Sequence, residues 1–178
     1  YMTGDSLISV IVPVYNDLER FKQCLKSLCQ QEYPQDGFEI LIIDDGSNDG
    51  LGQWVASYRG QTRRAIEYLR QENKGPAAAR NTGIKNSRGL ILAFIDSDCV
   101  AADNWLKEIV RGYDSDRVAG VGGRIEADPV DSPVSRYCAY IQMNRLPKTD
   151  PEGIKYLITG NASFRKDCLD SVGGFDER

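Results

Sequence analysis

Apolar and polar residues alternate along this chain in blocks whose lengths predict strands and helices in turn. Short apolar runs bounded by turn residues predict buried strands at residues 7–12, 38–43, 65–69, 90–95 and 118–125. Helical spacing, capping residues and a Pro-Ala-Ala-Ala start predict helices at residues 18–28 and 51–58, from residue 76, and at 103–110 and 167–172. Pro13 is expected to break the first strand, and Asn16 or Asp17 to cap the first helix. This alternation predicts an α/β fold whose parallel sheet is covered by helices on both faces.

The strand predicted at residues 90–95 ends abruptly in two carboxylates, Asp96 and Asp98. Side chains of an extended segment repeat every two residues, so both carboxylates are expected on the same side. Ligands of open α/β sheets bind beyond the carboxyl ends of the strands. Two hard oxygen ligands at such a place suit a divalent cation, which in turn suits a phosphate ligand. The alternative is a polar turn in which an aspartate caps the next helix.

Other predicted strand ends carry residues that suit a nucleotide. Tyr15 offers a ring face for a base, although a partly buried loop aromatic is the alternative. Asp45 offers an acceptor for the N–H of a pyrimidine, and an Asx-turn is the alternative. Arg80 offers a cation for a phosphate, and an exposed salt bridge is the alternative. Since the carboxyl ends of parallel strands share one edge, these residues are expected to form one site.

Composition narrows the chemistry. The 178 residues are ordinary in hydrophobic content, and a net charge of −4 with no dense Lys/Arg run argues against nucleic acid as a partner. No apolar stretch approaches the roughly 18 residues that span a bilayer. Five cysteines with no CxxC pair fit a reducing compartment, and Cys24 is expected in the core. With no histidine in the chain, acid–base chemistry must come from carboxylates or, failing them, Lys, Tyr or Cys.

The segments around these residues resemble the family 2 glycosyltransferases. The matching segments, in order, are Val10-Ile-Val-Pro-Val-Tyr-Asn16, Ile42-Ile-Asp-Asp-Gly-Ser47, Asn73-Lys-Gly-Pro-Ala-Ala-Ala-Arg-Asn81, Phe94-Ile-Asp-Ser-Asp98, Thr159-Gly-Asn-Ala-Ser-Phe-Arg165 and Gly173-Gly-Phe-Asp-Glu177. The resemblance covers nearly the whole chain. It implies the GT-A fold, a Rossmann-like three-layer α/β/α sandwich with a mostly parallel sheet, formed here by one domain at residues 1–178.

The resemblance also assigns roles to residues of this chain. Pro13 and Tyr15 would border the nucleobase, Asp45 would hydrogen-bond it, and Asp44 would support that loop or reach the ribose. Further donor contacts would come from residues after the later strands. These are Arg80 and Asn81 near phosphate or ribose, Asp96 at the ribose or a metal-bound water, and Gly160 and Asn161 on the sugar and acceptor side. Asp98, with Asp96, would bind Mn²⁺ or Mg²⁺.

The implied reaction is an inverting transfer of a sugar from a nucleoside diphosphate, with UDP preferred for the small pyrimidine site. The metal would stabilise the leaving diphosphate, and a carboxylate would deprotonate the acceptor. In this family the base usually lies in an acidic motif shortly after the Gly173–Glu177 segment, and this chain stops at Arg178. The chain is therefore expected to bind nucleotide and metal but to transfer sugar poorly. The catalytic base remains unassigned.

Partners and location follow from the same resemblance. A saccharide or lipid-linked acceptor is expected, in the cytoplasm or at the inner face of the cell membrane, with any membrane anchor outside this chain. Residues 127–153 are expected to form an irregular surface excursion beside the site.

Three alternatives stay open. A haloacid dehalogenase-like phosphatase would use Asp96 as nucleophile and Asp98 as general acid, although its motif normally opens the fold. A non-catalytic nucleotide-sugar-binding domain would use the same fold without turnover. A dinucleotide-dependent oxidoreductase is weaker, because no GxGxxG follows the first strand.

Overall fold

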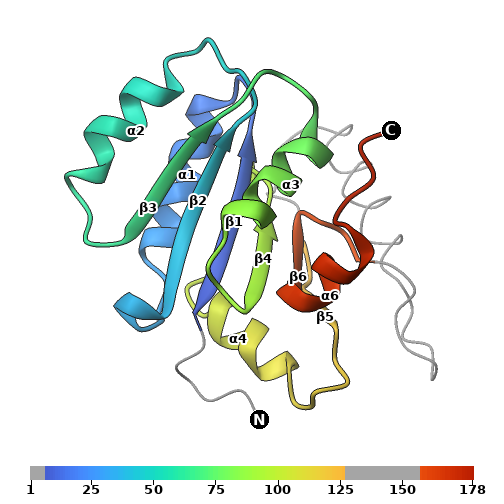
Figure 1. The fold of residues 1–178 in the computed structure, drawn as a ribbon. Helices are drawn as coiled ribbons and strands as arrows, with labels where there is room; N and C mark the ends of the chain where they lie inside the picture. Colours follow the sequence, from blue (N-terminus) through green and yellow to red (C-terminus); the bar gives the residue numbers. More distant parts are fainter. Residues whose placement is uncertain (1–6, 127–156) are drawn as a thin grey trace, which may run out of the picture.

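The computed structural model describes residues 7–126 and 157–178, and these form a single six-stranded sheet with helices on both faces (Figure 1). The strands are β1 (Ile8–Val14), β2 (Phe38–Asp44), β3 (Ala65–Arg70), β4 (Ile91–Ile95), β5 (Gly120–Gly122) and β6 (Asn161–Arg165). The helices are α1 (Leu18–Cys29), α2 (Leu51–Arg59), α3 (Pro76–Asn86), α4 (Trp105–Gly112) and α6 (Lys166–Val172), with a 3-10 turn, η1 (Gln35–Gly37), before β2. The surface excursion expected at residues 127–153 lies outside the described residues.

The strand order is β3-β2-β1-β4-β6-β5. Strands β1 to β4 are mutually parallel, as expected, whereas β6 runs antiparallel to both β4 and β5. Strand β6 was not predicted from the sequence, because its residues, Asn-Ala-Ser-Phe-Arg, form no apolar run. The strand predicted at residues 118–125 is shorter in the structure. Only Gly120–Gly122 pairs with β6 at this glycine-rich edge.

Pro13 does not break the first strand, which continues to Val14. The backbone N–H of Asp45 donates to the carbonyl of Val14, so the backbone polar groups of Val14 point toward β2. The backbone nitrogen and carbonyl of Pro13, one residue earlier, therefore point toward β4. The pairing of β1 with β4 has already ended at Ile11, opposite Phe94. A proline fits here because its missing N–H leaves no ladder bond unmade.

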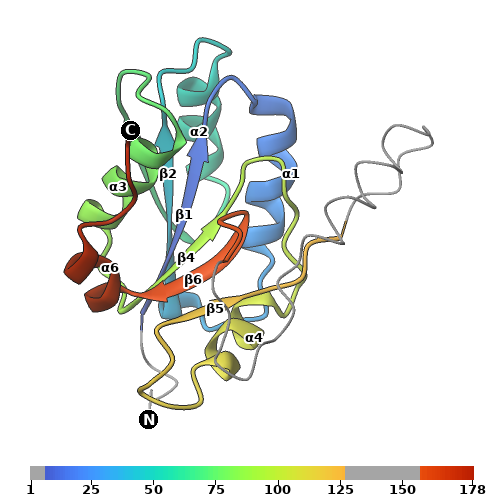
Figure 2. The ribbon, with the colours of Figure 1, turned by 90° about the vertical axis from the view of Figure 1, so that its right-hand side faces the viewer.

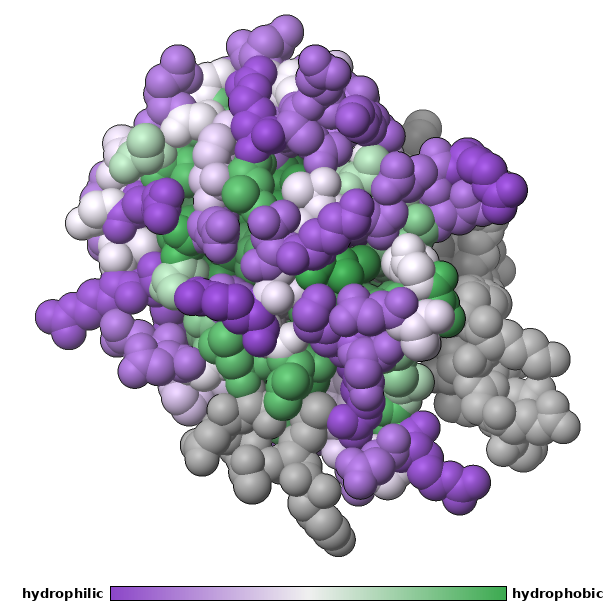
Figure 3. Space-filling model, viewed as in Figure 1, coloured by the Kyte–Doolittle hydropathy of each residue, from purple (hydrophilic) through white to green (hydrophobic). Residues whose placement is uncertain are grey.

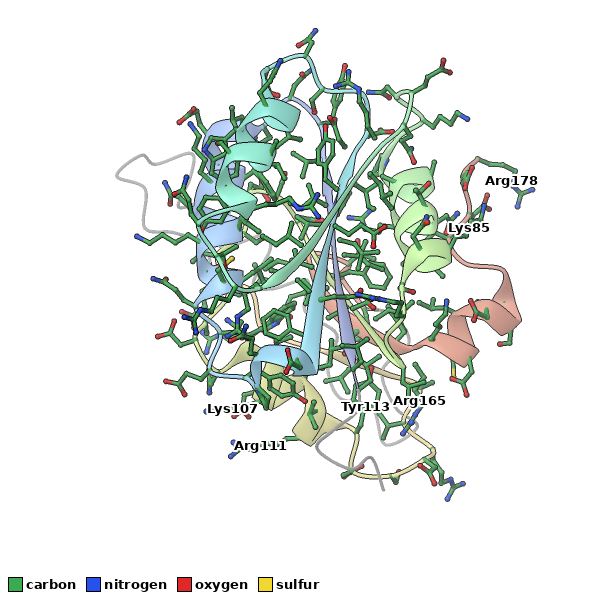
Figure 4. All side chains as sticks on the ribbon, turned by 60° about the vertical axis from the view of Figure 1, so that its left-hand side comes forward. Lys85, Lys107, Arg111, Tyr113, Arg165 and Arg178 are labelled. Atoms are coloured by element: carbon green, nitrogen blue, oxygen red, sulfur yellow. The ribbon has the colours of Figure 1, made fainter. Side chains whose placement is uncertain are left out.

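Two apolar clusters divide the core between the faces of the sheet. Helices α1, α2 and α4 cover one face, on which the side chains of Val10 and Val12 lie. Helices α3 and α6 cover the other face, on which the side chain of Ile11 lies. Figure 2 shows α3 and α6 on one side of the sheet and α1 on the other, and Figure 4 shows α1 and α2 opposite α3 and α6. The expected three-layer α/β/α arrangement is confirmed.

Two helices begin differently from expectation. Asp17 is at the N-cap of α1 but makes no capping hydrogen bond. Instead, the Leu18 N–H donates to Asp49 Oδ2 at 2.8 Å, and Asp49 Oδ1 also accepts from the first N–H of α2. Helix α4 begins at Trp105, two residues later than the helix expected at residues 103–110, and has no side-chain cap. The cap of α1 thus comes from a loop distant in sequence, which local spacing does not reveal.

Because β1, β2, β3 and β4 are parallel, their carboxyl ends meet at one edge, toward which their arrowheads point in Figure 1. Hydrophilic residues cover this end of the molecule in the same view (Figure 3). The described residues contain no helix that is long and apolar enough to cross a membrane.

Candidate functional site

The loops that follow β1 and β2 are bonded to each other at the carboxyl edge. Asn16 adopts a positive φ of 49°, and its N–H donates to Ser47 Oγ at 3.0 Å. Its side-chain Oδ1 accepts from the N–H of Asn48 at 2.8 Å. Tyr15, beside it, is 53% exposed. The paired loops therefore present an aromatic ring to solvent from a fixed backbone.

Asp44, the last residue of β2, is fully buried and supports its own loop. Its Oδ1 accepts from the N–H of Ser47 at 2.7 Å, and its Oδ2 accepts from the hydroxyl of Tyr68 and from Arg70 Nη1. Burial, followed by the hydrogen bond to Asp44, raises the pKa of Tyr68 to about 12. Of the two roles expected for Asp44, loop support is the one with contacts in the structure.

Asp45 links β2 to the start of α3. Its Oδ1 accepts from Gln71 Nε2 at 2.7 Å and from the Lys74 N–H at 2.9 Å, and its Oδ2 accepts from the Gly75 N–H at 2.8 Å. Gly75 is the N-cap of α3 and has a φ of 88°, a conformation that favours glycine. The carboxylate is 4% exposed. A ligand that reaches it would share oxygens that already organise this loop.

Arg80, on α3, meets Asp96 after β4. Arg80 Nη2 lies 2.7 Å from Asp96 Oδ1, and Arg80 is 9% exposed. Arg80 Nε is a buried donor without a hydrogen-bond partner among the described residues. A Cβ at Gly160 would lie 2.9 Å from Asp96 Oδ2, so this glycine allows the backbone to approach the carboxylate. Asp96 is thus held between α3 and the residue that precedes β6.

Asp98 is the exposed member of the pair. Its Oδ2 lies 3.6 Å from Arg20 Nη1, and the two side chains are 48% and 68% exposed. Arg20 also pairs with Asp17 at 2.6 Å, and Asp17 accepts a hydrogen bond from Ser97 Oγ at 2.9 Å. The hydrogen bond and charge of Asp17, and then the charge of Asp98, raise the pKa of Arg20. Neither Asp17 nor Arg20 was predicted at this site, because the pattern around them indicates only the start of a helix.

The carboxylates at this turn suit a hard cation only with help from a ligand or water. Among the residues that the structure describes, no three His, Cys, Asp or Glu side chains gather to hold a metal ion. Asp98 is exposed and Asp96 is partly exposed, so both can supply oxygens. Mg²⁺ typically takes one or two carboxylates and completes its shell with water and substrate phosphates. The residues present fit a cation that arrives with a phosphorylated ligand.

Asn161 and Asn81 make contacts of a different kind. Asn161 Oδ1 accepts from Trp105 Nε1 at 2.8 Å, and its Nδ2 donates to the carbonyl of Arg124, so it fastens α4 to the end of β5. The amide of Asn81 is bonded to Phe175 and to the side chain of Glu177. Neither amide contacts Asp96 or Asp98 within the described chain.

The cysteine thiols near this turn are not activated. Cys24 is fully buried, which confirms its expected place in the core, and burial raises its pKa. Burial, and then the charges of Asp98 and Asp96, raise the pKa of Cys99 to about 11. A thiol is a nucleophile only as the thiolate, so these cysteines do not favour covalent catalysis.

A cavity of about 360 Å³ opens at the opposite edge, where β1, β2 and β3 begin. Its lining includes Glu39 and Arg88, which pair with each other at 2.6 Å. The polar loops described above lie at the other end of the strands. The candidate site is therefore the carboxyl edge, where unpaired donor and acceptor capacity remains.

Comparison with known proteins identifies the family. The family model described as "Glycosyl transferase family 2" matches residues 9–173. The chain belongs to glycosyltransferase family 2. Glycosyltransferase AglE of Haloferax volcanii is 32% identical over 170 residues, which cover 94% of this chain and 55% of AglE. Glycosyltransferase GlyA of Streptococcus pneumoniae serotype 4 is 31% identical over 175 residues, which cover 98% of this chain and 22% of GlyA.

Solved structures agree on the fold. The mannosyltransferase PcManGT from Pyrobaculum calidifontis, in complex with GDP-Man and Mn²⁺, superposes with a TM-score of 0.77 at 23% identity, over 96% of this chain and 47% of that one. Residues 1–349 of S. aureus TarS in complex with UDP give a TM-score of 0.74 at 24% identity, over 96% and 50%. These similarities confirm the GT-A fold. This chain spans about half the length of these two proteins. The family match does not favour the phosphatase alternative.

Proposed function

We propose that this chain is the donor-binding part of a metal-dependent, inverting glycosyltransferase that uses a nucleoside diphosphate sugar. One observation carries the proposal: the Asp96-Ser97-Asp98 turn stands at the carboxyl edge with Asp96 fixed by Arg80 and Asp98 exposed. The family match supports the reaction class. The PcManGT structure contains a sugar nucleotide together with Mn²⁺, which supports a divalent cation as cofactor.

The nucleoside would lie across the loops after β1 and β2. The exposed ring of Tyr15 offers a stacking face, with Pro13 beside it in β1. Asp45, which organises the loop before α3, offers the acceptor for the base. Asp44 supports the loop after β2 by accepting from the Ser47 N–H. We infer UDP as the nucleotide, because this acceptor and ring suit a small pyrimidine. The TarS structure with UDP supports this choice, and the PcManGT complex makes GDP the second candidate.

The diphosphate would lie between the Asp96–Asp98 turn and α3. Asp98, with Asp96, would hold the Mn²⁺ or Mg²⁺, which neutralises charge on the leaving diphosphate when it is bound. Arg80 sits beside Asp96 with a second donor, Nε, that lacks a partner within the described residues, and a phosphate oxygen would satisfy it. Gly160 allows the sugar side of the site to approach Asp96 closely.

The base that would deprotonate the acceptor hydroxyl is not assigned to a residue of this chain. Neither carboxylate at the C-terminal end is assigned that role. Asp176 pairs with Arg178 at 2.8 Å, which lowers its pKa, and Glu177 accepts from Asn81. We infer that this chain binds the donor together with the metal. A saccharide or lipid-linked acceptor at the inner face of the cell membrane fits this reaction class.

Calorimetric titration of UDP with and without Mn²⁺ tests the proposal. We expect Mn²⁺ to strengthen UDP binding, and Asp98→Ala to abolish that increase. Asp103→Ala is the matched control, because Asp103 is exposed and lies five residues further along the chain. If UDP fails and GDP binds with Mn²⁺, the base assignment is wrong but the class holds. If neither nucleotide binds, or if Asp98→Ala binds like the wild type, the proposal is overturned.

A non-catalytic nucleotide-sugar-binding domain is the remaining alternative. It predicts the same binding but no turnover. Release of UDP from UDP-GlcNAc by the protein, dependent on an acceptor, would exclude it.

A further inference from the structure

The segment after α6 is bonded to α3 through one side chain. Asn81 is 8% exposed, and its Nδ2 donates to the Phe175 carbonyl at 2.8 Å and to Glu177 Oε1 at 2.7 Å. Its Oδ1 accepts from the Phe175 N–H at 2.8 Å. Both donors of the amide are therefore used within this segment, and neither remains for a ligand.

Two glycines bring the segment to this place. Gly173 and Gly174 have φ angles of 80° and 84°, which turn the chain sharply after α6. A Cβ at Gly174 would lie 2.5 Å from Asn81 Oδ1, so a side chain there would displace the amide. The segment runs beside α3 in both Figure 1 and Figure 2.

The same segment also reaches β4. The ring of Phe175 packs edge-on against that of Phe94, with centroids 5.3 Å apart and planes at 88°. Phe94 precedes Asp96 by two residues, and Asn81 directly follows Arg80. The segment therefore touches a near neighbour of each member of the Arg80–Asp96 pair.

This link matters because α3 packs mainly on β1 and β2, whereas Asp96 follows β4. The Arg80–Asp96 contact therefore joins α3 to the turn after β4 through a single 2.7 Å bond. We propose that residues 174–177 brace α3 against β4, and that Asn81 is the positioning residue through which they hold Arg80 and Asp96 in register. The inference rests on the proposed function and changes one expectation: Asn81 acts through its neighbours rather than touching the donor.

Binding measurements separate this role from a general loss of structure. In Asn81→Ala we expect Mn²⁺-dependent UDP affinity to fall by about tenfold, as for other residues that orient metal ligands. UDP affinity without Mn²⁺ should fall less, because the base contacts lie on other loops. Asn86→Ala is the matched control, since Asn86 is exposed on the same helix and its side chain donates to the carbonyl of Thr82, one turn earlier. Glu177→Ala removes one of the three bonds at an exposed position and should give a smaller loss in the same direction.

Hydrogen exchange provides a readout that needs no nucleotide. The Cys99 N–H donates to the carbonyl of Asp96 at 3.1 Å, so its exchange reports the order of the turn. We expect faster exchange in residues 96–99 of Asn81→Ala and wild-type exchange in Asn86→Ala. Unchanged exchange, or metal-dependent affinity equal to wild type, overturns the brace. If the wild type binds no nucleotide, the proposed function fails, and exchange alone decides the brace.

Discussion

Glu39 is a buried carboxylate whose removal has an effect that can be worked out from its contacts. It lies in β2, and its side chain is 2% exposed. Its Oε1 accepts from Ser9 Oγ at 2.6 Å and from the Arg88 N–H at 2.8 Å, and its Oε2 accepts from Arg88 Nε at 2.8 Å and Nη2 at 2.6 Å. Ser9 Oγ in turn accepts from the Gly89 N–H. The network ties β1 and β2 to the loop before β4.

The change Glu39→Gln keeps the shape of the side chain and removes its charge. The amide oxygen can still accept from Ser9 and from the Arg88 N–H, but the amide nitrogen faces the donors of the guanidinium. Two charge-assisted hydrogen bonds are therefore lost. Hydrogen bonds to charged groups are each worth about 1.5–3 kcal/mol when buried. The Arg88 side chain is 69% exposed and regains water, so we expect a total loss of about 2 kcal/mol at neutral pH.

The pH dependence has a definite sign. Burial raises the pKa of Glu39, but the hydrogen bonds from Ser9 and Arg88 and the charge of Arg88 outweigh it, and the pKa lies below its ordinary value of 4.5. The unfolded chain therefore takes up the proton first as pH falls. The contribution of Glu39 is complete above about pH 4.5 and is lost as pH falls through the folded-state pKa.

Urea unfolding of wild type and variant at several pH values measures this directly. The difference in the free energy of unfolding should be largest at pH 7 and should shrink below pH 4.5. Glu108→Gln is the control, because the Glu108–Arg111 pair has a similar 2.6 Å contact but is exposed on α4 (Figure 4), and it should change stability by less than about 0.5 kcal/mol. A variant as stable as wild type at pH 7, or a difference that grows in acid, would refute the argument.

Two further substitutions test close packing, one at Gly83 against the core and one at Gly160 beside Asp96. Gly83→Ala would place a Cβ in overlap with the side chain of Ile11. Overpacking destabilises the fold more than the higher helix propensity of alanine stabilises it, so we expect the free energy of unfolding in urea to fall by about 1–2 kcal/mol. In Gly60→Ala the new Cβ would lie 3.9 Å from the carbonyl oxygen of Ser57, an ordinary contact, so this change should be neutral or slightly stabilising. Equal behaviour of the two variants would contradict this reasoning. Gly160→Ala should push the Asp96 carboxylate and weaken Mn²⁺-dependent UDP binding by about threefold to tenfold, with stability within about 0.5 kcal/mol of wild type. Unchanged binding by that variant would show that Asp96 can move without consequence.

Most of the fold could be predicted because its signals are local. The parallel strands are buried on both faces, so they are visible as apolar runs such as the one that ends at Ile95. The start of α3 at Pro76 was predicted correctly, since a proline fits the first turn of a helix. Strand β6 could not be predicted in this way. Its residues pair with β4 at the sheet interior, and its partners, not its own pattern, determine its conformation.

The candidate site was harder to predict because a residue type does not reveal which group it meets. Asp44 and Asp45 are adjacent residues of the same type with different contacts. Asp44 accepts from the Ser47 N–H in the loop after β2, whereas Asp45 accepts from the Gly75 N–H at the start of α3. Arg80 and Asn81 are also adjacent, yet one meets Asp96 and the other meets the C-terminal segment. Neighbours on a helix point about 100° apart, so a motif that is continuous in sequence is divided between two surfaces. We therefore expect Asn81 to support the site from a second surface rather than to touch the donor.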